Sequence, residues 1–326
     1  MDEALVSAVQ RNAGFVSSMK SEIARVIVGQ DHMVNAAIIA LLTGGHILLE
    51  GVPGLAKTLL CNTIARVVEC QFKRIQFTPD LLPADLIGSL AYRQNDGTFY
   101  AKKGPIFANL VLADEINRAP AKVQSALLEA MQEKQVTIGD TTYPLPSPFL
   151  VIATQNPIDQ EGTYPLPEAQ VDRFMLKVVI DYPSEQEEKL ILDRMTAHRK
   201  IIPNSITSAS NLIAAASVVE DIHIAQRVRD YIVSIICATR NPENYGLSAI
   251  RTSIARGASP RATIALAAAA KANAFINQRA YVHPDDIKAL AKDVLRHRIT
   301  LTYEAEADNV TPNDIIDTIL KKIEAP

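Results

Sequence analysis

The stretch of sequence that decides the fold lies at residues 46–58, which read His-Ile-Leu-Leu-Glu-Gly-Val-Pro-Gly-Leu-Ala-Lys-Thr. An apolar run, typical of a buried strand, meets a glycine-containing turn that ends in Lys57 and Thr58. This is the layout of a phosphate-binding loop between a strand and a helix. Gly51 and Gly54 let the backbone bend tightly and point its N–H groups inward, and the following helix adds the positive end of its dipole. We therefore expect Lys57 to reach the β- and γ-phosphates of a nucleoside triphosphate and Thr58 to contact Mg²⁺.

One residue of this loop departs from the usual pattern, because Ala56 stands where the motif normally has its second glycine. Alanine accepts a negative φ freely, so we predict a negative φ at residue 56. A positive φ there would mean that this interpretation of the loop is wrong.

The size and charge of the chain limit its function classes. With 326 residues it is long enough for two ordinary domains. Its 33 Lys and Arg against 36 Asp and Glu give a net charge of −3, so there is no overall bias toward nucleic acid or an anionic membrane. Trp is absent and aromatic residues are scarce, which argues against stacking platforms for single strands. We expect no nucleic-acid partner.

The cysteines and the apolar segments indicate a cytoplasmic protein. The spacing of Cys61, Cys70 and Cys237 fits neither a disulfide framework nor a zinc site, and Cys61 is expected to be a small buried hydrophobe. The N-terminus lacks the basic and apolar regions of a signal peptide. The most apolar stretch, 35–52, contains two glycines and a histidine, so we interpret it as a helix, a turn and a strand rather than a membrane span.

Strand-like and helix-like patterns alternate over the first two-thirds of the chain. The apolar runs rich in Ile, Val, Leu and Phe suit strands buried on both faces, and they lie at 46–50, 72–77, 109–113, 149–154 and 174–180. Strands that alternate with helices predict an α/β fold with a parallel five-stranded sheet, which we place at residues 1–183.

Two further segments interrupt this alternation. The segment at about 88–106 contains Asn95-Asp96-Gly97, a strong hairpin signal, and a second hairpin is expected at about 133–146, around Gly139-Asp140. Taken from the residues alone, both are equally typical of surface loops with no further role.

The last third of the chain carries no strand pattern. We interpret 184–225 as a connecting segment and 226–326 as an all-helical domain, with helices near 226–239, 260–278, 284–298 and 312–323. Ser259-Pro260 and Thr311-Pro312 each place a capping residue before a proline at the first helical position.

Two acidic residues provide a partner for the phosphate-binding loop. The apolar run at 109–113 ends in Asp114 and Glu115. Because Mg²⁺ prefers carboxylates, phosphate oxygens and water, Asp114 is a candidate metal ligand, and Glu115 can orient and polarise an attacking water. Two acids at a strand end are also common turn chemistry, but the order strand, loop, helix and acidic strand favours the catalytic interpretation.

Other candidate residues each have a structural alternative. Asn156, at the tip of the strand at 149–154, can lie beside the γ-phosphate or simply start the Asn–Pro turn. Arg173 is either an arginine finger that reaches a neighbouring subunit's nucleotide or a surface arginine paired with Asp172. Arg261 lies in the first turn of a helix, where its charge does not favour the dipole; this suggests an anionic ligand or a structural ion pair. Val28 and Gly29 can form an apolar wall for adenine, although a plain turn is the favoured interpretation.

Taken together, these residues resemble an AAA+ ATPase, and within that class the chain resembles the MoxR family over nearly its whole length. The loop at 51–58, Ala56 included, has the form that this family favours. The supporting segments are 76–85, 113–119, 153–157, 166–174 and Ser259-Pro260-Arg261.

The resemblance assigns roles to single residues. It implies that Lys57 and Thr58 are the Walker A residues, Asp114 and Glu115 the Walker B residues, Asn156 sensor 1, Arg173 the arginine finger and Arg261 sensor 2. Arg118 is another candidate at a subunit boundary. Catalytic roles then fall to Lys57, Glu115, Asn156 and Arg173, and metal binding falls to Thr58 and Asp114. The residues expected to contact ATP are Val28, Gly29, Gly51, Val52, Pro53, Gly54, Leu55, Ala56, Lys57, Thr58, Leu59 and Arg261.

The resemblance also implies how the protein works. A hexameric ring with a helical lid is expected, with 88–106 as the helix-2 insert and 133–146 as the hairpin before sensor 1, both candidates for contact with client proteins. Members of the family resemble chaperones that support assembly or metal-cofactor loading of other enzymes, often with partners that contain von Willebrand factor A domains. Two alternatives remain: the motor subunit of a magnesium or cobalt chelatase, and a nucleotide-dependent scaffold with little turnover. A DNA helicase is less well supported.

Overall fold

The computed structural model of the chain describes residues 3–52, 54–95, 97–156, 163–196 and 201–326. The chain divides into two compact units. The first, which we call the sheet unit, comprises Phe15–Arg173 and Val178–Ile213. The second, the helical unit, comprises Met1–Gly14, Phe174–Lys177 and Ala214–Pro326.

A five-stranded sheet carries the first unit. Its strands lie in the order β2-β5-β8-β1-β9, and their bounds are β1 Ile47–Glu50, β2 Phe72–Gln76, β5 Leu110–Asp114, β8 Leu150–Gln155 and β9 Leu176–Val179. The pairings of β2 with β5, β5 with β8 and β1 with β8 are parallel. The three central strands are almost wholly buried, as their continuous apolar sequences require. The predicted parallel five-stranded sheet is confirmed, and its carboxyl ends collect the residues that follow each strand.

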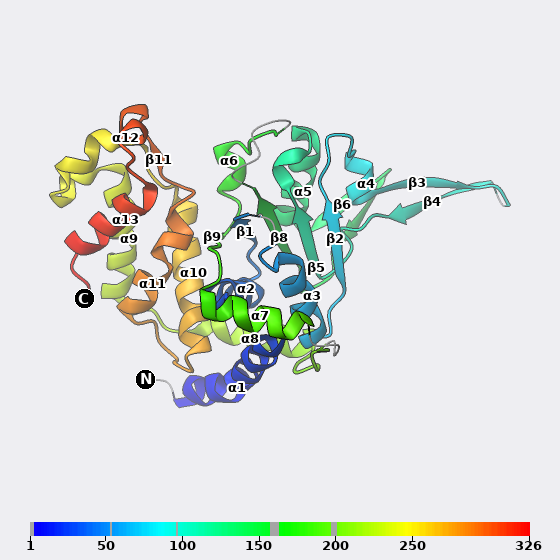
Figure 1. Cartoon of the computed structure of the whole chain (residues 1–326), viewed down its shortest axis with the longest axis horizontal. Coiled ribbons are helices and arrows are strands. Elements are labelled where there is room, and N and C mark those ends of the chain that lie inside the picture. The colour runs from blue at the N-terminus through cyan, green and yellow to red at the C-terminus, as the bar shows by residue number, and fades with distance from the viewer. Residues whose placement is uncertain (1–2, 53, 96, 157–162, 197–200) are drawn as a thin grey trace. The chain divides into compact units, whose positions relative to one another are not determined.

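Helices cover both faces of this sheet. Figure 1 shows α3 (Lys57–Val67) and α5 (Ala121–Glu133) on opposite sides of it. The buried stripe of α3 includes Leu60, Ile64 and Val67, which follow the helical repeat. The other helical elements of this part of the chain are α2 Asp31–Thr43, α4 Pro83–Ile87, η1 Ile116–Arg118 and α6 Glu168–Val171.

Both predicted hairpins are present. Strands β3 (Gly88–Arg93) and β4 (Thr98–Lys103) pair antiparallel and form an arm that projects from the sheet unit (Figure 1). Strands β6 (Gln135–Ile138) and β7 (Thr141–Pro144) form the second hairpin, with Gly139 in the turn at a φ of 62°. A Cβ on Gly139 would lie 2.7 Å from the Cδ1 of Leu90, so the glycine lets the second hairpin pack closely against the base of the arm.

The helical unit contains the four helices expected from the sequence and several short elements. The four are α9 Gln226–Arg240, α10 Pro260–Ile276, α11 Pro284–Leu295 and α13 Pro312–Lys322. The hydroxyl of Ser259 accepts a hydrogen bond from the Arg261 N–H (3.2 Å), and Thr311 caps α13 in the same manner. The short elements are η2 Pro242–Tyr245, η3 Ser248–Ser253, α12 Tyr303–Ala307 and a strand pair, β10 Ile254–Arg256 with β11 Thr300–Leu301.

Three helices lie outside the helices predicted from the sequence. They are α1 Glu3–Val26, α7 Glu185–Thr196 and α8 Ala209–Asp221. Helices α7 and α8 fall within 184–225, which we interpreted as a connecting segment. Residues of α7 hold the sheet unit together, because the Arg194 guanidinium donates hydrogen bonds to the carbonyl oxygens of Ala24 and Arg25 in α1 (3.0 and 2.9 Å).

Candidate active site

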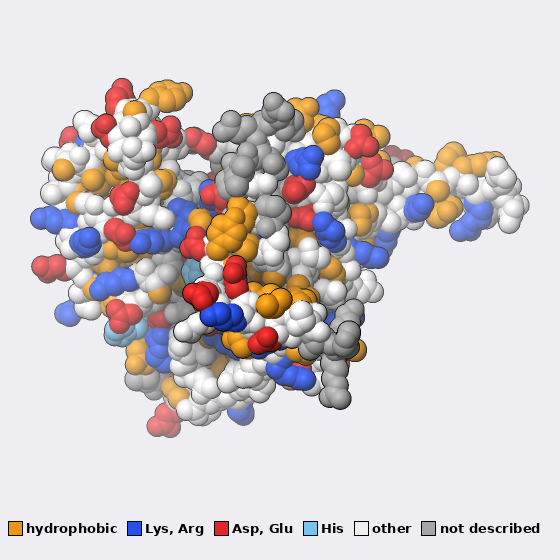
Figure 2. All heavy atoms as spheres, in the orientation of Figure 1, with side chains coloured by type: hydrophobic (Ala, Val, Ile, Leu, Met, Phe, Trp, Pro, Cys, Tyr) orange, Lys and Arg blue, Asp and Glu red, His pale blue; other side chains and the backbone are white. Residues whose placement is uncertain are grey.

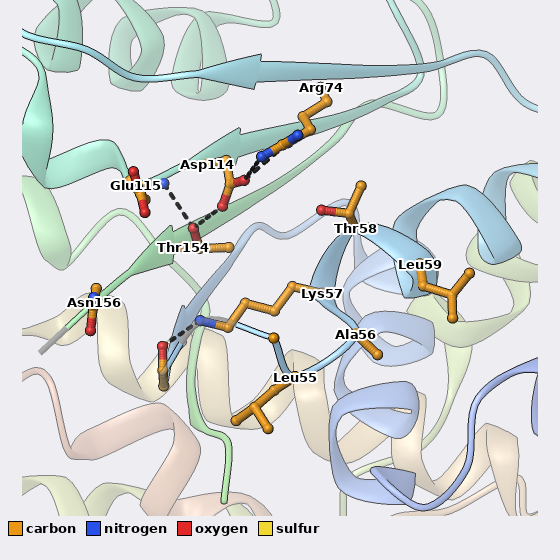
Figure 3. Close-up of a pocket in the computed structure, with 12 residues that line it drawn as sticks. Leu55, Ala56, Lys57, Thr58, Leu59, Arg74, Asp114, Glu115, Thr154 and Asn156 are labelled. Atoms are coloured by element: carbon orange, nitrogen blue, oxygen red, sulfur yellow. Dashed lines mark hydrogen bonds and ion pairs between the residues drawn. The ribbon is translucent and has the colours of Figure 1, made fainter. Parts of the chain in front are cut away.

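A cavity of about 400 Å³ opens where the carboxyl ends of β1, β5 and β8 meet the start of α3 (Figure 3). Parallel α/β sheets bind ligands at this edge, outside the carboxyl ends of their strands. Its walls come from the loop after β1, from the tips of β5 and β8 and from β2. The lining residues are Gly51, Gly54, Leu55, Ala56, Lys57, Thr58, Leu59, Arg74, Asp114, Glu115, Thr154 and Asn156.

The glycines of the loop are needed for its path. A Cβ on Gly51 would lie 2.9 Å from the carbonyl oxygen of Ile180, so only glycine allows the loop to pass so close to the chain after β9. Gly54 has a φ of 90°, which a side chain would strain. Lys57, the first residue of α3, donates a hydrogen bond from its Nζ to the carbonyl oxygen of Gly51 (2.5 Å). The loop thus closes around the lysine amine.

The predicted negative φ at Ala56 is wrong. Ala56 has a φ of 56° and a ψ of 16°, the left-handed conformation, at the N-cap of α3. The chain has to reverse direction at this point to enter the helix, and a left-handed residue makes that turn; this explains why the motif normally has glycine here. Our interpretation of the loop's backbone was therefore wrong at this residue, although the loop still brings Lys57 and Thr58 into the cavity.

The charge of Lys57 is set by two opposing effects. Burial lowers the pKa of the Lys57 amine from its ordinary value, and this is the larger effect. The carboxylates of Asp114 and Glu115 act in the opposite direction and favour the charged amine. The cavity therefore holds a partly desolvated cation close to two acids, an arrangement suited to a polyanionic ligand.

Asp114, the last residue of β5, is held by two side chains. Its Oδ1 accepts a hydrogen bond from the Thr154 hydroxyl (2.7 Å). Its Oδ2 accepts from both Nε and Nη2 of Arg74 on β2 (3.0 and 2.6 Å). The carboxylate is only 16% exposed, so its orientation is fixed by these neighbours.

Glu115 follows directly and adopts a left-handed backbone conformation, with a φ of 57°. Its N–H donates to the hydroxyl of Thr154 (2.8 Å). Its Oε2 accepts from Gln76 Nε2 (2.8 Å) and from Arg118 Nη1 (2.9 Å). Non-glycine residues with positive φ often occur at functional sites, and here the turn carries the carboxylate to the edge of the cavity.

The remaining predicted residues lie in different places. Asn156 lines the cavity after the end of β8. Arg173 follows α6, and its guanidinium donates to Gln132 Oε1 (3.1 Å) and to the Ala169 carbonyl oxygen (3.0 Å). Arg261 is exposed in the first turn of α10, in the helical unit.

The two residues proposed as an adenine wall are not among those that line this cavity. Gly29 lines a separate cavity of about 340 Å³, together with residues of α1 and α2. Val28 and Val52 are half-buried and line neither cavity among the described residues. Pro53, also predicted to contact the nucleotide, lies outside the described residues.

Sequence reasoning missed three residues of the site: Arg74, Gln76 and Thr154. Their hydrogen bonds to the two acids depend on which strands are neighbours, and the register places Gln76 opposite Asp114. The signal was present but weak. Arg74 and Gln76 are polar residues two positions apart near the carboxyl end of a strand, so they lie on the same face.

The oxygen donors of this site suit Mg²⁺. Among the described residues, no three or more His, Cys, Asp or Glu side chains gather as a metal site. Magnesium is usually held by one or two protein oxygens together with phosphate oxygens and water, and the Thr58 hydroxyl and the Asp114 carboxylate line the same cavity. These residues therefore fit a metal that arrives with a phosphate ligand.

Within the part of the chain that the structure describes, no helix combines the length and the apolar character needed to cross a membrane.

Known proteins match nearly the whole length of this chain. The family described as ATPases associated with various cellular activities (AAA) matches residues 46–176, and the AAA lid domain matches residues 247–319. The chain is 50% identical over 308 residues to Chaperone MoxR1 of Mycobacterium tuberculosis, which covers 94% of this chain and 81% of that protein. It is 42% identical to protein YeaC of Bacillus subtilis, over 93% of this chain and 92% of that one.

A solved structure agrees with these relatives. The structure of a protein from Cytophaga hutchinsonii, assigned as an ATPase, superposes with a TM-score of 0.94 and 51% identity over 99% of this chain and 98% of that one. The resemblance inferred from the motifs is confirmed by these matches. The chain belongs to the MoxR family of AAA+ ATPases.

Proposed function

We propose that this protein hydrolyses ATP in a Mg²⁺-dependent reaction. We propose further that it uses the cycle to remodel or assemble partner proteins, or to load metal cofactors into them. One observation carries the catalytic part: a single cavity gathers a half-buried lysine and a hydroxyl from the loop after β1 with two acids from the end of β5. The family supports ATP as the ligand.

Lys57 and the loop hold the phosphates in this proposal. The Lys57 amine, now bound to the Gly51 carbonyl oxygen, exchanges that partner for phosphate oxygens. The start of α3 adds N–H groups and the positive end of the helix dipole. The Thr58 hydroxyl and the Asp114 carboxylate hold Mg²⁺, which when bound neutralises developing charge on the phosphates.

Glu115 positions the attacking water. Gln76 and Arg118 both donate to Oε2, which fixes the carboxylate and leaves Oε1 to accept a proton from water. The Asn156 amide, in the same cavity, contributes a second polar group beside the γ-phosphate. Attack in line with the leaving oxygen then transfers the γ-phosphoryl group to water.

Arg173 is our candidate for the residue that completes the site of a neighbouring subunit. It does not line the cavity of its own chain among the described residues, whereas Arg118 already binds Glu115 within the same chain. We therefore assign the finger to Arg173 and a positioning role to Arg118. Arg261 is assigned to the nucleotide as sensor 2, from the helical lid. This arrangement requires a neighbouring subunit, and we propose that the subunits form a hexameric ring.

The projecting arm is our candidate for contact with partner proteins. Tyr92 and Phe99 lie opposite each other on one face of it, with ring centroids 5.2 Å apart, and they are 56% and 67% exposed. Figure 2 shows hydrophobic and basic side chains along the arm. A two-stranded hairpin gains little from burial by itself, so an apolar face on it suits a binding role. The name of the relative Chaperone MoxR1 supports a chaperone role. We propose that the protein plays this role in the cytoplasm, with von Willebrand factor A domain proteins as partners.

The substitution Glu115→Gln tests the catalytic proposal. It keeps the size and the hydrogen bonds of the side chain but removes the negative charge that polarises water, so turnover of ATP should fall by about 10²-fold or more while ATP binding is retained. The matched control is Glu129→Gln, an exposed residue of α5, which should hydrolyse ATP at the rate of the unchanged protein. Normal turnover by Glu115→Gln would show that another residue positions the water.

The Glu115→Gln protein also serves to identify partners, because it should remain in its ATP-bound state. Proteins that co-purify with it from native lysate in ATP, and are released when ADP replaces ATP, would be the remodelled partners. Co-purification that does not respond to the nucleotide would argue against ATP-driven remodelling.

A further inference from the structure

Arg74 has no role in the proposed reaction, yet its side chain lies in the same cavity as the phosphate-binding loop. It comes from the edge strand β2 and reaches across to β5, where it holds Asp114 Oδ2 with two N–H groups, at 3.0 and 2.6 Å. Figure 3 shows the guanidinium pointing at this carboxylate. The carboxylate that suits the metal is thus already paired with a cation.

The pairing leaves little of Asp114 for a metal ion. A carboxylate oxygen has two lone pairs, and Arg74 occupies both on Oδ2. On Oδ1 one lone pair accepts from the Thr154 hydroxyl. A divalent ion bound at Oδ2 must displace the guanidinium, and one bound at Oδ1 lies within a few ångströms of its positive charge. Arg74 opposes metal binding in either case, because like charges at that distance repel.

The Arg74 side chain can also move to a different anionic partner. It is 49% exposed, so its long side chain is not locked by packing. Its Nη2 already donates a second hydrogen bond, to Gln76 Oε1 (2.8 Å). The guanidinium has five N–H donors in a fork that matches phosphate oxygens. Because it lines the cavity together with Lys57 and Thr58, a phosphate in that cavity offers it a new anionic partner.

We propose that Arg74 and the divalent metal compete for Asp114, and that nucleotide phosphates resolve the competition by drawing Arg74 away from the carboxylate. This inference rests on the proposed function, since it assumes that phosphates and Mg²⁺ share the cavity. Arg74 is then a positioning residue that sets how much free Mg²⁺ is needed to load the site. It also delays metal binding until a nucleotide is present.

The proposal predicts that Arg74→Gln weakens metal-free nucleotide binding but lowers the Mg²⁺ concentration that the site requires. Without the guanidinium the cavity loses positive charge, so a nucleotide without metal should bind about three- to ten-fold more weakly. The freed Asp114 carboxylate should at the same time bind metal more readily, so the Mg²⁺ concentration that gives half of the metal-dependent gain in nucleotide binding should fall about three- to ten-fold. A residue that merely supports the structure would weaken both kinds of binding when it is replaced.

Binding of the fluorescent, slowly hydrolysed analogue mant-ATPγS tests these expectations. Its dissociation constant is measured first in EDTA and then across a Mg²⁺ titration for the unchanged protein and for Arg74→Gln. The equilibrium between Mg²⁺ and free nucleotide is common to all variants and cancels in the comparison. Titration with Mn²⁺ in the presence of the same analogue, followed by the loss of the free-ion EPR signal, reports metal occupancy directly.

Two further variants give the controls. Arg66→Gln removes an exposed arginine of α3 that does not line the cavity and should change neither quantity. Arg74→Lys keeps a single positive charge but loses the fork, and should fall between the unchanged protein and Arg74→Gln.

An unchanged or increased Mg²⁺ requirement in Arg74→Gln would overturn the proposed competition. If the unchanged protein binds mant-ATPγS neither in EDTA nor in Mg²⁺, the proposed function itself is overturned, and this inference with it.

Discussion

At the scale of single residues, Ala56 is one of the positions where this chain accepts backbone strain. Its left-handed conformation, with a φ of 56°, is one that glycine adopts without penalty and that alanine adopts at a cost of about 1–2 kcal/mol. Alanine is also a poor N-cap residue compared with glycine. The chain therefore holds its phosphate-binding loop in a shape that its own residue disfavours.

The substitution Ala56→Gly should increase the free energy of unfolding by about 0.5–1 kcal/mol. The relieved strain is larger than the entropy that glycine adds to the unfolded chain, which offsets about half of it. Urea unfolding followed by circular dichroism measures the change. The control, Ala126→Gly in the middle of α5, should have the opposite sign and destabilise by about 1 kcal/mol. Destabilisation by Ala56→Gly would mean that residue 56 does not hold the left-handed conformation in solution.

His46, just before β1, ties three elements of the sheet unit together. Its Nδ1 accepts a hydrogen bond from the Val151 N–H (3.0 Å) on β8, so the ring proton is on Nε2, which donates to the Met131 carbonyl oxygen (3.1 Å) on α5. Burial lowers the pKa of His46 to about 4, because the charged ring would be desolvated. The folded protein therefore keeps this histidine neutral.

This depressed pKa predicts that the protein loses stability in mild acid. An unfolded chain, with an ordinary histidine pKa, binds a proton below about pH 6.5, whereas the folded state takes it up only near a pKa of about 4. Between these values unfolding is coupled to proton uptake, and His46 alone should remove about 2 kcal/mol from the free energy of unfolding between about pH 7 and about pH 5.

Urea unfolding of His46→Gln at both pH values checks this contribution. The variant should be less stable than the unchanged protein at pH 7 but should show a smaller loss on acidification. Burial also lowers the pKa of His297, so part of the pH dependence should remain. His32→Gln, at an exposed position in α2, is the control and should keep the full loss. An equally steep loss in His46→Gln would exclude His46 as its source.

The residues of the cavity differ in how far sequence could predict them. Lys57 and Thr58 belong to a continuous motif, and Asp114 and Glu115 end an apolar run, so each was visible locally. That they share a cavity follows from topology, because carboxyl ends of neighbouring parallel strands meet at one edge. Arg74 gave only a weak signal, as a polar residue near the end of a strand, because its partner is set by the pairing of β2 with β5.

At the scale of secondary-structure elements, what could be predicted depended on burial. The three central strands, β1, β5 and β8, are apolar on both faces, so their sequence pattern and their burial agree. The edge strands β2 and β9 combine buried with more exposed residues. Helix α7 was missed because none of its residues is buried and it therefore lacks the apolar stripe that a packed helix shows. Helix α10 was found through its cap, Ser259-Pro260, rather than through periodicity. A surface helix with neither a cap nor a buried stripe leaves no such signal in the sequence.

The two residues before β9 are held by the turn after α11, within the helical unit. Arg298, which is 8% exposed, donates hydrogen bonds to the carbonyl oxygens of Phe174 (2.7 Å) and Met175 (3.2 Å), and also to that of Val294. His297 Nε2 donates to the same Phe174 oxygen (3.0 Å). These bonds satisfy backbone groups that would otherwise be buried without a partner.

The substitution Arg298→Met should therefore destabilise the protein by about 2–4 kcal/mol. The methionine fills a similar volume but leaves buried carbonyl oxygens without their charged donor. Thermal and urea unfolding measure the loss. Arg251→Met, at an exposed position in η3, provides the control and should change the free energy of unfolding by less than about 0.5 kcal/mol. A loss of under about 1 kcal/mol in Arg298→Met would show that water replaces the guanidinium and that the contact is dispensable.

At the scale of the whole molecule, the question is whether one chain contains a complete site. The cavity supplies a lysine, a hydroxyl, two acids and an amide, but Arg173 is bound instead to Gln132 and Ala169. If Arg173 serves the next subunit, each active site is shared between two chains, and a ring of such heterologous contacts closes on itself. An arginine finger increases turnover by about 10³–10⁵-fold in other nucleotide hydrolases, so an isolated chain should be a slow enzyme.

Mixing two inactive variants distinguishes shared sites from self-contained ones. Lys57→Ala cannot hold the phosphates, and Arg173→Ala cannot supply the finger, so each should be nearly inactive alone. In a randomly mixed ring about a quarter of the interfaces join an intact Lys57 to an intact Arg173, and these should recover about a quarter of the normal turnover. Substituting Arg118→Ala for Arg173→Ala in the mixture should give no such recovery, because Arg118 binds Glu115 of its own chain. Energy transfer between fluorescently labelled subunits first shows that the rings have exchanged subunits. If the first mixture then turns over ATP only at the summed rates of the two separate variants, Arg173 does not act in the neighbour's site. If turnover recovers in the mixture of Lys57→Ala with Arg118→Ala but not in the mixture with Arg173→Ala, Arg118 is the finger instead.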